Sequence, residues 1–236
     1  MARIWHGTVA VLVVAAVAVQ LVVAVRVSGS PHETTAGVLR GSSLVGRIIR
    51  VFSFFTILSN VLCGVVCGQL AVRPDRDGRA WRAARLASLV GITVTGVVYS
   101  SVLARIHQPR GPAETFVNAL VHYVIPVMVV GGWVVLGPRP RVDVRTVLLS
   151  LVFPLCWSVY TLVRGAIWDW YPYPFVDVST RGYLVVLRNA LLVVIVLCVV
   201  AAAFAVGDRL LPPAPARISR PRRPPVHRDS HLPGAP

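Results

Sequence analysis

The sequence contains no lysine, so all 24 of its basic residues are arginine, and only 9 residues are acidic. Charged residues make up 14% of the chain, whereas hydrophobic residues make up 56%. The apolar residues also occur in blocks of about 20, which is longer than the helices of a soluble core require. The scarcity of charge therefore excludes an ordinary soluble domain and indicates an integral membrane protein.

Acidic residues are too few to balance the arginines, and the formal net charge is +15. Such an excess can indicate a protein that binds nucleic acid. Here the arginines stand in short loops between apolar blocks and in the C-terminal tail, which is the distribution expected from membrane topology. We therefore predict membrane lipids as partners and no nucleic acid.

Cysteine is also scarce, and the motifs of several enzyme classes are missing. The four cysteines all fall in apolar blocks, which favours a packing role over disulfides or a metal site. The chain has no G-x-S-x-G elbow, H-E-x-x-H motif or phosphate loop. A membrane haem would need paired histidines, and only His122 lies deep in an apolar block. The sequence therefore predicts no metal and no cofactor.

Six apolar blocks are each long enough for a helix to cross a hydrocarbon layer of about 30 Å. Their residues do not alternate as the strands of a β-barrel would. The first block exceeds the usual ~7–15 residues of a signal-peptide core, so we interpret it as a retained span. The blocks are approximately 7–27, 47–72, 84–106, 115–136, 146–163 and 183–206.

The predicted fold class is thus an all-α membrane protein, a six-helix transmembrane bundle over residues 1–207. The Pro- and Arg-rich tail, residues 208–236, has almost no bulky apolar residues and is predicted to be disordered. Arginine bias favours both termini in the cytoplasm, because Arg3, five arginines from Arg73 to Arg85 and the tail then all face inward. The expected location is the cell membrane.

The stretch FSFFTILSNVLCG, residues 52–64, places polar side chains in the second block, where burial without a partner is costly. Ser53, Thr56 and Asn60 follow helical spacing and are predicted to share one face. In the N-in orientation, Thr56 lies about 13 Å below the start of its block, and His122 of the fourth block lies about 10 Å below its own. Thr56 and His122 are therefore predicted to lie at the same level.

A threonine hydroxyl needs a base within hydrogen-bond reach to become a nucleophile, and histidine is the usual base. Thr56 and His122 are accordingly the candidate catalytic pair. The alternatives are that Thr56 bonds its own helix carbonyl and that His122 makes a structural bond between helices. Intramembrane ionisable groups are functional-site candidates by default, which favours the catalytic hypothesis.

Four further residues are candidates for substrate binding. Asn60 would polarise a carbonyl or join two helices, and Tyr99 falls in the same outer half as the pair. Arg188 would bind a carboxylate, extend toward the interface or pair with Asp177. Asp177 belongs to an aromatic loop before the sixth block that is predicted either to anchor this block or to cover the site, with Asp177 turned toward Arg188 or His122.

That loop contains YPYPFVDV, residues 171–178, in which two prolines exclude a regular helix. Together with FFTILSNVL at 54–62 and HYVIPVMVVGGW at 122–133, it resembles motifs of the "Pr-six-Pr" family of bacterial six-helix membrane proteins. This family is related to the androgen-induced membrane proteins of animals. Those relatives are threonine hydrolases that cleave fatty-acid esters of hydroxy fatty acids, and Thr56 and His122 match their threonine and histidine by motif position.

The resemblance implies a membrane hydrolase that cleaves lipophilic esters with a threonine nucleophile and a histidine base. The alternative is a small transporter or lipid-binding protein that uses the same polar layer without catalysis. We see no internal repeats and no Gly/Pro interruptions of the spans, both of which would favour a transporter.

Overall fold

The computed structural model describes residues 1–26, 42–109, 111–139 and 142–211, and every regular element in these ranges is helical. Six helical segments within them are long and apolar enough to cross a membrane, as predicted. These spans are Ala2–Arg26, Phe55–Val72, Arg79–Arg105, Gly111–Leu136, Val144–Trp168 and Val178–Leu210. The described chain is therefore compatible with a multi-pass membrane protein.

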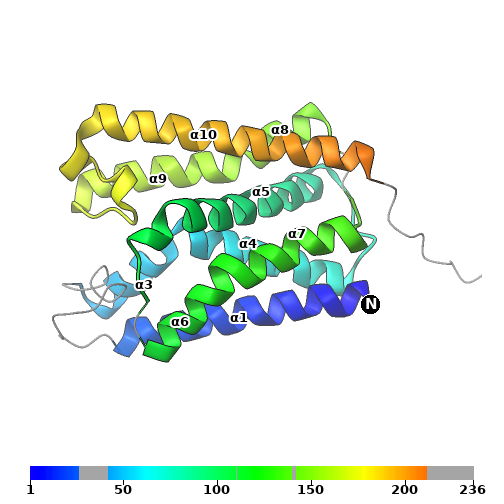
Figure 1. The fold of residues 1–236 in the computed structure, drawn as a ribbon, viewed down its shortest axis with the longest axis horizontal. Coiled ribbons are helices and arrows are strands. Elements are labelled where there is room, and N and C mark those ends of the chain that lie inside the picture. The colour runs from blue at the N-terminus through cyan, green and yellow to red at the C-terminus, as the bar shows by residue number, and fades with distance from the viewer. Residues whose placement is uncertain (27–41, 110, 140–141, 212–236) are drawn as a thin grey trace, which may run out of the picture.

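The helices run roughly parallel to one another along the long axis of the bundle (Figure 1). They are α1 (Ala2–Arg26), α3 (Leu44–Ser53), α4 (Phe55–Val72), α5 (Arg79–Ser101), α6 (Gly111–Ala119), α7 (Ile125–Leu136), α8 (Val144–Ser150), α9 (Val152–Trp168) and α10 (Val178–Leu210). A short 3₁₀ turn (Leu103–Arg105) follows α5, and a π-helical turn (Leu120–Val124) joins α6 to α7.

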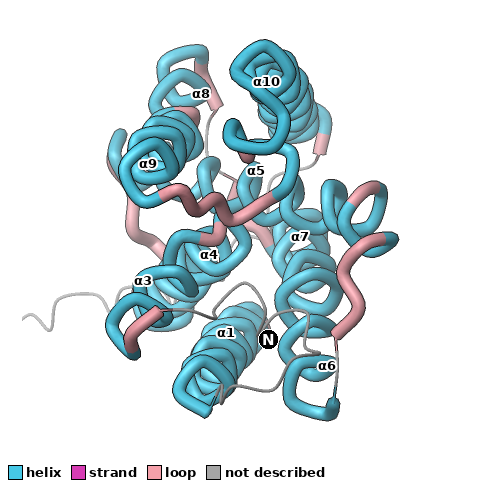
Figure 2. Tube along the Cα trace, turned by 90° about the vertical axis from the view of Figure 1, so that its left-hand side faces the viewer, coloured by secondary structure: helices cyan, strands magenta, loops and turns pink. Residues whose placement is uncertain are grey.

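Helix α5 occupies the middle of the bundle, with the other long helices around it (Figure 2). Its Leu86, Val90 and Ile92 side chains are fully buried. The outer helix α10 instead exposes large apolar side chains, among them Leu187 and Leu191. Such a face is costly in water but suits contact with lipid tails.

The second apolar block is not one helix, contrary to the sequence-based expectation. Phe54 has an extended backbone, with φ −73° and ψ 127°, and separates α3 from α4. Ser53 and Thr56 therefore do not share a helix face; Ser53 instead contacts the Tyr160 hydroxyl at 2.8 Å. Because α3 and α4 are separate helices, residues 47–56 do not form the continuous helix from which the depth of about 13 Å was calculated for Thr56.

The ends of the described chain lie at one end of the bundle (Figure 1). Helix α10 continues to Leu210, three residues beyond the predicted boundary at 207. The predicted disordered tail lies, from residue 212 onward, outside the described residues.

At the opposite end, the YPYPF segment crosses between α9 and α10. As its prolines predict, it is irregular and contains only a 3₁₀ turn, Pro174–Val176. Two side chains of α10 hold its backbone: Arg181 Nε donates to Pro174 O at 2.7 Å and Asn189 Nδ2 to Phe175 O at 2.9 Å. The segment is thereby fixed over the interior of the bundle.

Candidate active site

A cavity of about 290 Å³ opens into the bundle beneath the YPYPF segment. We call it the large chamber. Its walls are mainly apolar, with a few polar side chains among them, which is the usual composition of a small-molecule site. The lining residues are Gln20, Val51, Phe54, Thr56, Ile57, Tyr99, Leu103, Ile106, His107, Glu114, Val117, Asn118, Val121, His122, Pro172, Tyr173 and Pro174.

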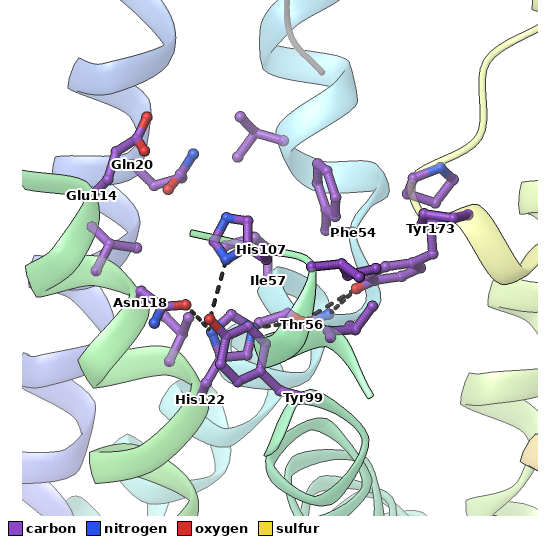
Figure 3. A pocket seen from close by; sticks show the side chains of 17 residues that line it. Gln20, Phe54, Thr56, Ile57, Tyr99, His107, Glu114, Asn118, His122 and Tyr173 are labelled. Atoms are coloured by element: carbon purple, nitrogen blue, oxygen red, sulfur yellow. Dashed lines mark hydrogen bonds between the residues drawn. The ribbon is translucent and has the colours of Figure 1, made fainter. Parts of the chain in front are cut away.

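Thr56 and His122 meet in this chamber (Figure 3). Thr56 Oγ1 lies 3.4 Å from His122 Nε2. A nucleophile and its base are often somewhat further apart without substrate than the 2.6–3.2 Å of a short hydrogen bond. The predicted proximity of the two side chains is confirmed, although they come from residues 66 positions apart in the chain.

Asn118 determines which nitrogen of His122 faces the threonine. His122 Nδ1 lies 2.8 Å from Asn118 Oδ1, one helical turn away. An amide oxygen only accepts hydrogen bonds, so Nδ1 must carry the proton and donate it. In the neutral imidazole, Nε2 is then the unprotonated nitrogen. His122 is thus oriented as an acceptor for the Thr56 hydroxyl proton.

Tyr99 holds the plane of the His122 ring by stacking against one of its faces. The two rings are stacked, with centroids 3.6 Å apart and an interplanar angle of 14°. The Tyr99 hydroxyl in turn lies 3.1 Å from His107 Nδ1 in the connector after α5. Burial lowers the pKa of His107 from its ordinary value, opposed in part by the nearby Glu114 carboxylate.

The backbone at His122 forms a π-helical turn. Pro126 leaves one carbonyl of this turn without a donor, and Asn60 supplies that donor. The Ile125 N–H bonds to Leu120 O, and Pro126 has no N–H to offer to the next carbonyl. Val121 O is therefore left without a donor from its own helix. Asn60 Nδ2 supplies one at 3.2 Å and also donates to Thr56 O at 2.8 Å. One buried amide thus ties the helix of Thr56 to the turn of His122.

Tyr173 reaches Thr56 from the YPYPF segment. Its hydroxyl lies 3.1 Å from Thr56 N and 3.2 Å from Thr56 Oγ1. Thr56 N–H belongs to the first turn of α4, where backbone donors have no partner within the helix. Burial raises the pKa of the Tyr173 hydroxyl above its ordinary value, so it remains a neutral donor near pH 7.

The predicted substrate-binding residues are only partly brought together. Tyr99 lines the large chamber, but Asn60 lies behind it and is fully buried. Asp177 caps the N-terminus of α10, accepting from Thr180 N at 3.3 Å and from Ser179 Oγ at 2.6 Å. Arg188 lies on the exposed face of α10. Neither Asp177 nor Arg188 lines the chamber, so the geometry does not support a role for either residue in binding the substrate.

Several residues of the chamber are absent from the predicted site. Asn118 has a sequence signal, because it precedes His122 by one helical turn. Tyr173 has a weaker one, as a tyrosine enclosed by two prolines in a rigid segment. Glu114 carries no signal of its own, since it stands at a block boundary, and Gln20 is a single polar residue within the first apolar block.

Within the described ranges, no group of three or more His, Cys, Asp or Glu residues is placed to hold a metal ion. The chain matches no model of a known protein family, no curated protein and no solved structure.

Proposed function

We propose that this chain is an intramembrane hydrolase of lipophilic esters, with Thr56 as nucleophile and His122 as general base. The observation that carries the proposal is the alignment of three side chains, Thr56, His122 and Asn118, in one mainly apolar chamber. Nucleophile, base and orienting group within hydrogen-bond reach are the common feature of unrelated acyl-transfer enzymes. The resemblance of three motifs to the Pr-six-Pr family supports the same activity, and we propose the cell membrane as its location.

The reaction begins when Thr56 Oγ attacks the ester carbonyl carbon and His122 Nε2 takes the hydroxyl proton. The tetrahedral intermediate collapses as the carbon–oxygen bond to the alcohol breaks, and His122 donates its proton to the leaving oxygen. Water then attacks the acyl-Thr56 carbonyl while His122 again accepts a proton. Return of this proton to Thr56 Oγ releases the acid and regenerates the site.

The oxyanion of each intermediate would lie near the first turn of α4. The Tyr173 hydroxyl and the Thr56 N–H already meet there, at 3.1 Å. A carbonyl oxygen that displaces their mutual bond gains both donors, and the N-terminal end of an 18-residue helix favours negative charge. Such donors act strongly in an apolar surrounding, because the local dielectric constant is low.

Labelling of the purified protein with a fluorophosphonate probe tests the proposal. We expect covalent labelling of the native chain, and its loss in Thr56→Ala and His122→Gln. Thr93→Ala is the matched control, since the Thr93 hydroxyl bonds only Leu89 O of its own helix at 2.7 Å. Labelled tryptic peptides should place the adduct on Thr56.

The same chamber would serve a transporter or lipid-binding protein that performs no chemistry. In that case Thr56→Ala would retain binding of a fluorescent fatty ester, and neither labelling nor hydrolysis would be found in the native protein. Absence of both activities in correctly folded protein would overturn the hydrolase proposal.

A further inference from the structure

Thr56 also borders a second, smaller cavity. We call this cavity, of about 50 Å³, the small chamber. It is lined mainly by apolar residues of α5, α9 and α10, whereas α9 and α10 contribute nothing to the large chamber and α1, α3 and α6 line only that one. Only three residues line both: Thr56, Leu103 and Tyr173. The candidate nucleophile therefore stands in the wall between two cavities of unequal size.

We propose that the two chambers receive the two arms of the ester, a short acyl group in the small chamber and a bulky lipophilic alcohol in the large one. This inference rests on the proposed function, and it names the class of substrate: short-chain acyl esters of long or bulky alcohols. It differs from the long-chain acyl esters that the family resemblance implies.

The position of the base decides which arm enters which chamber. When the tetrahedral intermediate collapses, the proton on His122 Nε2 must reach the leaving alcohol oxygen. His122 lines the large chamber and not the small one. The alcohol must therefore extend into the large chamber. The acyl arm, on the other side of the carbonyl carbon, is directed toward the small chamber.

The volumes then set the length of each arm. A cavity of about 150 Å³ is known to hold one benzene ring. The small chamber, at about 50 Å³, has one-third of that volume and by the same scale accommodates an acyl group of about two carbons. The large chamber, at about 290 Å³, has room for a long chain or a ring system.

The small chamber also contains a polar group that a substrate would satisfy. Thr95 lines it and is only 5% exposed. Its hydroxyl has no hydrogen-bond partner among the described residues. Buried hydroxyls are nearly always paired, so a molecule that enters this chamber would find an unused hydrogen-bonding group in its wall.

The experiment compares the hydrolysis of two isomeric esters, dodecyl acetate and ethyl dodecanoate, by the 236-residue protein solubilised in detergent micelles. Both contain the same atoms and have similar hydrophobicity, but the short and long arms are exchanged. We expect kcat/KM at least 10-fold higher for dodecyl acetate. Equal rates or a preference for ethyl dodecanoate would overturn the inference, whereas Thr56-dependent hydrolysis of either ester would still support the proposed function.

Variants of the chamber wall provide a second, independent measure. Val193 of α10 is partly buried and lines the small chamber, so Val193→Ala should enlarge it and raise the rate for dodecyl hexanoate relative to dodecyl acetate by several-fold. Leu191→Ala is the matched control, because Leu191 is 59% exposed on the same helix and lines neither chamber. An unchanged profile in folded Val193→Ala would place the acyl arm elsewhere.

Discussion

At the scale of single residues, Asn118 is the side chain that determines which ring nitrogen of His122 carries the proton. The His122 ring is already held in its plane by Tyr99, but stacking does not distinguish the two ring nitrogens. Only the 2.8 Å contact from Asn118 Oδ1 does, because an acceptor at Nδ1 keeps the proton there. Asn118 is thus a positioning residue: it acts on the substrate only through His122.

Replacing Asn118 by Ala should lower kcat for ester hydrolysis by on the order of 100-fold, since a misdirected base contributes little. KM should change little, because Asn118 is one of many residues that line the large chamber and the others remain. Asn118→Asp should retain most of the activity, as a carboxylate also accepts from Nδ1–H. The measurement is steady-state kinetics beside thermal unfolding. A loss of kcat in Asn118→Asp equal to that in Asn118→Ala would contradict a role as acceptor.

Tyr173 and Asp177 belong to the same segment but have different environments, which predicts opposite results for two conservative changes. Tyr173→Phe removes the hydroxyl that contacts both Thr56 N and Thr56 Oγ1, and turnover should fall by on the order of 100-fold. Asp177→Asn should leave turnover and stability nearly unchanged, because asparagine caps a helix as well as aspartate does.

Side-by-side assays of hydrolysis and thermal stability check this pair. The segment covers the site through Tyr173 and its flanking prolines, which line the large chamber, and not through the carboxylate. If Asp177→Asn abolished turnover in stable protein, a role for this carboxylate in orienting the site would have to be restored.

At the scale of elements, the YPYPF segment depends on a close approach to α9. A Cβ atom built on Gly165 would lie 1.9 Å from the Tyr171 ring, so any larger residue must displace that ring. Glycine is less favourable than alanine within a helix, by roughly 0.5–1 kcal/mol at its middle, and Gly165 stands in the last turn of α9. The absence of a side chain at Gly165 therefore allows the YPYPF segment to lie against α9. Tyr171, which contacts this glycine, is next in sequence to the residues that cover the chamber.

Gly165→Ala should consequently move the segment and lower hydrolysis by at least several-fold, although alanine favours the helix. Gly131→Ala is the matched control, because no atom lies within 4 Å of a Cβ built there. It should leave turnover unchanged and stability equal or higher. Hydrolysis rates of both variants in the same detergent, with melting temperatures, provide the test. Full activity in Gly165→Ala would show that Tyr171 does not hold the segment in place.

The sequence pattern was sufficient to predict the number of membrane-spanning segments but not where the helices break. Long apolar blocks require helices in lipid, because each backbone group must be paired within its segment, and six spans follow from this alone. The break at Phe54 has no such signal, since phenylalanine neither fixes the backbone nor lacks a donor. It arises from tertiary contacts: Trp157 Nε1 donates to Ser53 O at 2.9 Å, and the Phe54 ring packs edge-on against Tyr173.

The sequence gives a partial indication of the π-helical turn at Leu120–Val124. Pro126 follows His122 by four residues, so an α-helical bond to His122 O is impossible. The response of the backbone depends on Asn60, which supplies a donor from another helix. The sequence thus predicted the pair Thr56 and His122, but not the break at Phe54 or the turn beneath His122, which are set by contacts between distant segments.

At the scale of the whole molecule, the site lies at the end of the bundle opposite to Met1 and Leu211 (Figure 1). The connector 73–78 and residues 137–139 lie at the same end as Met1, and the connector leads into the arginine-rich start of α5. At the site end, Arg50 and Arg164 instead lie over the Trp170 ring, at 5.1 and 4.7 Å from its centroid. Such stacking is suited to the membrane interface, where aromatic rings are enriched.

Arginines near span ends are retained in the cytoplasm, so we predict that the end with Met1 is cytoplasmic and that the site faces the outer leaflet. Alkaline phosphatase folds only where its disulfides form, outside the cytoplasm. Fused after the C-terminus in a bacterial host, it should be inactive, whereas an insertion after Gln108, in the connector beside the site, should be active. Green fluorescent protein at the same positions should give the reverse. Activity of the C-terminal phosphatase fusion would invert the topology and direct the search for substrates to esters of the inner leaflet.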